Sequence, residues 1–307
     1  MDSLNKYLIL GAVASILLMS ACSGETEDGT VDNGQKVIDP ELLDPNRSFN
    51  TNFDGKLFSV PSPVQTALLI RSSNLAYDES LLNSETNISN YASNTSKSLN
   101  LGIYGADLGY ATLYDQNAKA LSYINAVESL SNDLEIAGAF DANFLERFEE
   151  NSNNQDSMLV ILTEAFRKGD LFLKESDRKN SSALILTGGW LESMHFATNL
   201  YAKSKDERIF HRIGEQKQSL ETILEILKEY NVEGVNDEIL AQLGGLNELF
   251  QTVEISNEFV EPVTDESKKL TTIKNKSTMI MSAELEESIR AKVAEIRAAI
   301  VGQSVEG

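Results

Sequence analysis

The chain has few of the residues that usually carry catalysis or cross-linking. Its 307 residues include one cysteine, two histidines, one tryptophan and five prolines. A single cysteine excludes an intrachain disulfide, and so few prolines leave room for long helices. The sequence contains no HExxH zinc motif, no GxSxG nucleophile elbow and no phosphate-binding P-loop. We therefore expect no cofactor and no metal site, and we favour a role without catalysis.

Positive charge is also scarce. The chain has 26 lysines and arginines against 47 aspartates and glutamates, which gives a formal net charge of −21. Nucleic acid binding depends on lysine and arginine contacts to phosphates, so no nucleic acid partner is expected. The acidic balance favours solubility and basic partners, but it does not select a fold.

The first residues have the organisation of an export signal. Lys6 precedes an apolar run over 7–18, and small residues lead to Cys22. This run is shorter than the roughly 20 residues that a membrane-spanning helix needs. A cysteine directly after the small residues is typical of a bacterial lipoprotein signal, which here would comprise residues 1–21. An ordinary secretory signal is the alternative, because Met19 stands where lipoprotein signals usually carry leucine.

A lipoprotein signal implies that Cys22 carries a diacylglyceryl thioether and usually a third acyl chain. At about 0.8 kcal/mol per buried methylene, two or more chains give stable anchoring where one is marginal. We therefore expect a lipid-anchored protein of the outer membrane that faces the periplasm or the cell surface. Cys22 would then be unavailable as a thiol nucleophile.

Residues 22–52 are predicted to form a disordered tether. The stretch after Cys22 is acidic and rich in glycine, with too little apolar surface to fold. An acidic cluster behind a lipidated cysteine also resembles the surface-export signal of Bacteroidota lipoproteins. A plain solvated spacer that faces the periplasm is the alternative.

The remainder, residues 53–307, is predicted to be all-α, an antiparallel helix-hairpin bundle of one or two domains. The clearest helix covers 205–230, where Ser204 and Glu207 have capping-box spacing before a periodic apolar face. Residues 255–281 lack periodicity and are predicted to be a loop. Other predicted helices are 64–72, 99–134 with a break near 115–117, 144–150 after Asp141, 158–174 after Asp156 or Ser157, 183–201 after Ser181 or Ser182, 239–253 after Asn236, and a last one after Ser282.

Glycines recur inside these helical patterns. Gly102, Gly105 and Gly109 share one helical face, and Gly188 and Gly189 form a pair. Each interior glycine costs a helix roughly 1 kcal/mol relative to alanine. Close contact between helices is the expected compensation.

Three local strings carry a family resemblance. They are Phe58–Gln65, Leu99–Tyr110, and Thr187–Ser193 together with Phe196–Asn199. Together they resemble a family of bacterial lipoproteins of Bacteroidota type with a lipoprotein signal and an all-helical body. The resemblance implies a location in the cell envelope, and it supplies no catalytic residue.

Asp107 is the most informative charge of the helical body. On a helix it lies one turn from Tyr104 and Tyr110, so its face is apolar and aromatic. A carboxylate there must be hydrogen-bonded or paired, and Arg71 or Arg167 is the expected partner. It either fixes the register of packed helices or holds a ligand.

The ligand interpretation places Asp107 in a pocket with Tyr104, Tyr110, Tyr114 and Trp190. This would make the protein a small-molecule or peptide-binding lipoprotein. The interpretation we favour is a body that binds another envelope protein or has a structural role in the envelope. A hydrolase with an unfamiliar site is the third. Glu192 and His195 share a helical face, and we interpret them as a solvated or core-edge pair.

Overall fold

The computed structural model describes residues 49–53, 56–60, 71–72, 75–139, 143–258, 263–265, 270–272 and 276–302. The predicted signal peptide 1–21, Cys22 and most of the predicted tether lie outside these residues. So do Asp141 and all but the last two residues of the predicted helix 64–72. These predictions therefore stay predictions.

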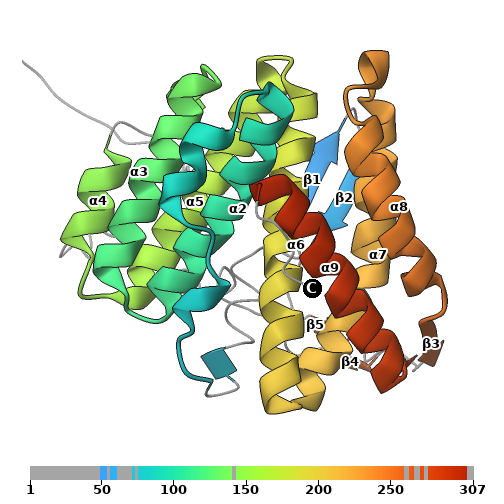
Figure 1. The fold of residues 1–307 in the computed structure, drawn as a ribbon. Helices are drawn as coiled ribbons and strands as arrows, with labels where there is room; N and C mark the ends of the chain where they lie inside the picture. The colour runs from blue at the N-terminus through green and yellow to red at the C-terminus, as the bar shows by residue number, and fades with distance from the viewer. Residues whose placement is uncertain are drawn as a thin grey trace, which may run out of the picture. The chain divides into compact units, whose positions relative to one another are not determined.

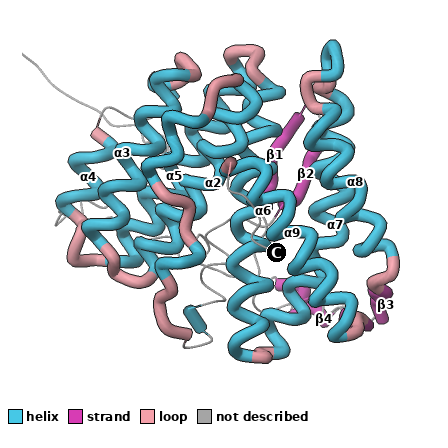
Figure 2. The backbone as a smooth tube through the Cα atoms, in the orientation of Figure 1, coloured by secondary structure: helices cyan, strands magenta, loops and turns pink. Residues whose placement is uncertain are grey.

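The all-α prediction is confirmed. Residues 252–282 separate the last two helices, and short connections join most of the others (Figures 1 and 2). Such connections make neighbouring helices antiparallel. Of the helices in the described residues, none is long and apolar enough to cross a membrane. The α-helices that lie wholly within the described residues are α2 (Asn94–Leu113), α3 (Asn117–Asp133), α4 (Phe144–Glu150), α5 (Gln155–Glu175), α6 (Lys179–Ser204), α7 (Glu207–Glu229), α8 (Asp237–Gln251) and α9 (Ala283–Val301).

The part of the chain that the structure describes also contains four short 3-10 helices: η2 (Glu79–Leu81), η3 (Glu85–Asn90), η4 (Ala137–Ala139) and η5 (Val232–Gly234). The first two belong to a segment that precedes α2. We name residues 78–91 the strap. Figure 1 shows it in cyan beside α2, and η3 contacts α3.

Three two-stranded antiparallel sheets occur in the described residues, and two of them correct a prediction. β1 (Phe49–Phe53) pairs with β2 (Lys56–Val60) at the boundary between the predicted tether and the helical body. β3 (Glu254–Glu258) pairs with β6 (Lys276–Ile280), and β4 (Val263–Asp265) with β5 (Leu270–Thr272). The loop predicted for 255–281 is therefore wrong at these strands. The pairing of β3 with β6 spans an intervening segment, and strands as short as β4 and β5 show too little alternation to be recognised.

Several helix boundaries differ from the prediction by a few residues. Asn154, rather than Asp156 or Ser157, accepts the capping hydrogen bond of α5, from the Ser157 amide. Asp206 caps α7 in place of Ser204. The Ser204 hydroxyl instead accepts a hydrogen bond from the Asp206 amide, before the helix begins. In both cases the predicted and the observed cap residues are close together in the sequence and are of types that favour the N-cap position. The sequence alone therefore does not decide which of these residues caps the helix.

Other boundaries follow the prediction more closely. The break between α2 and α3 falls at 114–116, and Ser282 caps α9 through the Leu285 amide. Asn236 stands at the start of α8 as expected, although its side chain makes no cap hydrogen bond. The helix α6 begins at Lys179, before the predicted caps Ser181 and Ser182.

The buried apolar side chains of the described residues form two clusters, and α6 supplies residues to both. Leu191 packs with α7, α8 and α9, whereas Phe196 and Leu200 pack with α2, α3 and α5. The helix is therefore buried on most of its surface and needs no polar face.

Two glycines bring α2 and α6 into backbone contact. A Cβ atom on Gly102 would lie 2.0 Å from the Ile185 carbonyl oxygen, and one on Gly188 would lie 1.9 Å from the Leu99 oxygen. The expected compensation for interior glycine is confirmed at these positions. Gly105 faces the Phe166 ring of α5 instead, and Gly109 has nothing within 4 Å. The glycines of α2 therefore do not form one packing face.

Candidate functional site

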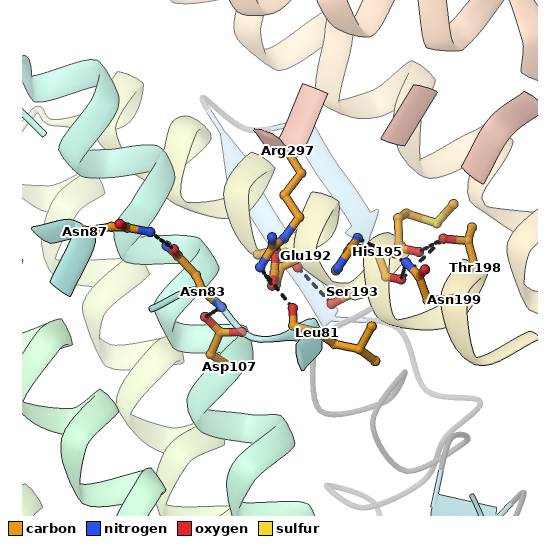
Figure 3. Close-up of polar contacts among 12 residues, drawn as sticks. Leu81, Asn83, Asn87, Asp107, Glu192, Ser193, His195, Thr198, Asn199 and Arg297 are labelled. Atoms are coloured by element: carbon orange, nitrogen blue, oxygen red, sulfur yellow. Dashed lines mark hydrogen bonds and ion pairs between the residues drawn. The ribbon is translucent and has the colours of Figure 1, made fainter. Parts of the chain in front are cut away.

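The polar centre of the structure is an ion pair between α9 and α6 (Figure 3). Arg297 donates from Nε to Glu192 Oε2 at 2.5 Å and from Nη2 to Oε1 at 2.6 Å. The same Nη2 donates to the Leu81 carbonyl oxygen of the strap at 3.0 Å. Glu192 is 0% exposed and Arg297 6%. Two charge-assisted hydrogen bonds in parallel hold these helices in one geometry.

Asp107 lies next to this pair and is also 0% exposed. Its Oδ2 accepts a hydrogen bond from the Asn83 amide at 3.3 Å, and its Oδ1 has no hydrogen-bond partner among the described residues. Burial raises the pKa of Asp107 well above its usual range, and the charge of Glu192 raises it further, against the opposing effect of Arg297. Both effects favour the neutral acid, because an ionised Asp107 would place a second negative charge beside Glu192 and a single guanidinium.

His195 stands one turn along α6 from Glu192. Burial lowers the pKa of His195 to about 4, although the charge of Glu192 acts in the opposite direction. Its Nδ1 lies 3.2 Å from Nδ2 of Asn199. The imidazole is therefore neutral at pH 7. The expected solvated position is wrong for Glu192, which is completely buried and bound to Arg297, whereas His195 is half-buried.

The expected arginine partners of Asp107 are also wrong. Arg71 pairs with the exposed carboxylate of Asp156 at 3.4 Å, and Arg167 is exposed. Sequence reasoning missed Arg297, which approaches from the last helix. One signal was present: Arg297 follows Val293 by four residues and therefore lies on the apolar face of α9. A cation on that face requires a buried partner.

The predicted tyrosines lie together, but Trp190 does not join them. Tyr104 and Tyr110 are fully buried, and the rings of Tyr110 and Tyr114 are 4.8 Å apart. Burial raises the pKa of all three hydroxyls, so they are neutral hydrogen-bond donors and acceptors. The Trp190 indole instead donates to Gln216 at 3.0 Å within the other apolar cluster.

The strap occupies the site of the predicted tyrosine and aspartate pocket. Asn83 is fully buried, and its main chain is bound on both sides, by Asp107 at the amide and by the Tyr123 hydroxyl at the carbonyl oxygen, 2.8 Å away. The Tyr104 hydroxyl donates to the Ser84 carbonyl oxygen at 2.8 Å. The Asn83 side chain donates to the Tyr91 hydroxyl at 3.0 Å. Nothing in the local pattern of 78–91 indicates these contacts.

The chemistry of this cluster is that of neutral donors and acceptors around one ion pair. Within the described residues, no group of three or more histidine, cysteine, aspartate or glutamate side chains could hold a metal ion. No family model, curated protein or solved structure matches this chain. The function therefore has to be argued from the geometry and from the N-terminal sequence.

Proposed function

We propose that this protein is a lipid-anchored protein of the cell envelope whose helical body binds another protein. The anchor is Cys22, which follows a short apolar run and small residues and is the single cysteine of the chain. Two or more acyl chains on this residue would hold the protein at a membrane without a spanning helix.

The non-catalytic part of the proposal rests on one observation: the central polar side chains form hydrogen bonds with other groups of the protein itself. Both carboxylate oxygens of Glu192 accept from Arg297, and Asp107 accepts from a main-chain amide of the strap. A general acid or base must reach the proton that it transfers. These side chains contact the protein itself, which supports a role in holding and presenting a surface.

Fractionation of cells that carry Cys22→Ser tests the anchor. We expect the wild-type protein in the membrane fraction and the variant in the soluble fraction. Ser23→Ala is the matched control, because it changes the neighbouring residue, leaves the cysteine in place and should remain in the membrane fraction. A Cys22→Ser protein that stays with the membrane would refute the lipid anchor.

Crosslinking in intact cells tests the binding role. Wild-type protein purified with its crosslinked neighbours should contain one envelope protein in stoichiometric amount by mass spectrometry. The Cys22→Ser protein should lose this partner, because release from the membrane removes the high local concentration that anchoring provides. Recovery of the wild-type protein alone would refute the binding role.

A further inference from the structure

The strap is held through its main chain by side chains from three helices. Tyr110 of α2 accepts from the Asp78 amide at 3.2 Å, and Arg297 of α9 donates to the Leu81 carbonyl oxygen at 3.0 Å. Asp107 and Tyr104 of α2 and Tyr123 of α3 bind the main chain at residues 83 and 84. Figure 3 shows two of these contacts, at Leu81 and Asn83. We name these five side chains the strap groove.

Main-chain hydrogen bonds can hold any sequence, so selectivity has to come from the side chains of the strap. Leu81 and Leu82 are buried, with 6% and 8% exposure, and Asn83 is fully buried. The Asn83 amide group donates to Tyr91 and accepts from Asn87 at 2.8 Å. Two leucines followed by an asparagine therefore fill the groove. Between the 3-10 helices η2 and η3 the main chain is extended at Leu82 and Ser84. At this short central part the division of roles is similar to that found where a protein binds an extended peptide.

The outer contacts of the strap are ion pairs with solvent access. Lys119 lies 3.2 Å from both Glu79 and Glu85, and Lys203 pairs with Asp78. The carboxylates of Glu79 and Glu85 are 66% and 24% exposed. Pairs with an exposed member, such as those of Glu79 and Lys203, contribute little to stability and are screened by salt, whereas the Lys119–Glu85 pair is half-buried. The strap therefore depends on its short central part, which a competing segment would have to replace.

We propose that the strap groove is a binding site for an extended segment of a partner protein that carries two adjacent leucines followed by asparagine. The strap occupies the groove as an intramolecular ligand and is displaced on binding. This inference rests on the proposed function, because it gives the place where the partner would bind. It predicts which segment of a crosslinked partner contacts the body.

The need to displace the strap lowers the affinity of the protein for a competing peptide. The strap competes at an effective concentration in the millimolar range, as expected for a ligand joined to its site by a short link. The affinity for a competing peptide falls in proportion to the fraction of molecules with an open groove. Weakening the strap should therefore strengthen peptide binding by about the same factor.

A synthetic peptide of residues 76–92 with a fluorescent label tests the inference on the purified full chain. The double variant Leu81→Ser, Leu82→Ser removes the two apolar anchors of the strap. We expect this variant to bind the peptide at least about tenfold more tightly than the wild type does, and its melting temperature to rise with added peptide. A control peptide with aspartate in place of both leucines should bind neither protein.

Amide hydrogen exchange of the wild type is the second measurement, and it does not require a variant that folds. Opening of the strap as a unit should make the amides of Asn83 and Tyr91 exchange faster than those of the α2 and α6 cores. Exchange of all these amides at one common slow rate would overturn the inference. So would peptide binding that is equally weak in the wild type and in a folded double variant.

The two proposals fail separately. A crosslinked partner that contacts another surface, together with no peptide binding, would refute the strap groove and leave the binding role intact. Peptide binding in vitro without any crosslinked neighbour in cells would refute the binding role in the envelope.

Discussion

The guanidinium of Arg297 binds both carboxylate oxygens of Glu192, and this pair lies where the helices of the two apolar clusters meet. Glu192 is on α6, which supplies residues to both clusters, and Arg297 is on the last helix. The same guanidinium reaches the strap at Leu81. One side chain therefore connects α6, α9 and the segment that precedes α2.

Replacement of Arg297 by alanine should destabilise the protein by about 3 to 5 kcal/mol, because it leaves the Glu192 carboxylate buried without its partner. Denaturant unfolding measures the loss. Lys292→Ala is the control on the same helix, since Lys292 pairs with the exposed carboxylate of Glu295 at 2.8 Å. That variant should change stability by less than about 1 kcal/mol.

A double-mutant cycle distinguishes the interaction energy between Glu192 and Arg297 from the cost of leaving one of the two charges buried without its partner. Glu192→Gln combined with Arg297→Met removes both charges and should cost less than Arg297→Met alone. If the double variant is as unstable as the sum of the single variants, the two side chains do not interact and the contact has no energetic role.

Asp107 should make stability decrease as pH rises. Its pKa in the folded state is raised above the ordinary value, mainly by burial. Above about pH 4, the pKa of an unfolded aspartate, the folded protein therefore binds more protons than the unfolded chain. The contribution of Asp107 to the free energy of unfolding is complete below that pH, and it is lost as the pH rises through the pKa of the folded state. Urea unfolding as a function of pH should show this decline in the wild type and not in Asp107→Asn.

The sign of the stability change in Asp107→Asn at pH 7 shows whether Asp107 is protonated or ionised in the folded protein. Asparagine resembles the neutral acid in shape, so Asp107→Asn should be as stable as the wild type or more stable at pH 7. Asp107→Ala removes the acceptor of the Asn83 amide and should cost about 1 to 3 kcal/mol. A strong loss of stability in Asp107→Asn would mean that the carboxylate is ionised in the folded state.

Gly102→Ala should destabilise the protein by about 1 to 3 kcal/mol or more, because the added Cβ would lie 2.0 Å from a main-chain oxygen of α6. Gly109→Ala on the same helix is the matched control. Nothing lies within 4 Å of its added Cβ, so relief of the cost of a helical glycine should stabilise the protein by roughly 0.5 to 1 kcal/mol. Thermal unfolding of both variants gives the comparison. Equal effects of the same sign would exclude backbone contact between α2 and α6 at Gly102.

Local patterns predict the helices because amphipathic periodicity and capping depend on residues that lie within a few helical turns of each other in the sequence. They also identified Asp107 as a carboxylate that needs a partner, since its neighbours on the helix are apolar. Its actual surroundings depend on Asn83 and Arg297, which lie far apart in the chain and meet only after the helices pack. The paired strands β3 and β6 were missed for the same reason, because their register is set across an intervening segment.

Tyr123→Phe should loosen the strap without disturbing α6, because the hydroxyl of Tyr123 donates to the Asn83 carbonyl oxygen at 2.8 Å. A buried carbonyl left without a donor costs about 1 to 3 kcal/mol. Hydrogen exchange should become faster at the strap amides by more than at α6. Tyr77→Phe is the control, since the buried hydroxyl of Tyr77 has no hydrogen-bond partner among the described residues, and its loss should leave exchange unchanged. An equal acceleration throughout the helices in Tyr123→Phe would instead make the strap part of one cooperative core, and the groove could then open only when the whole body unfolds.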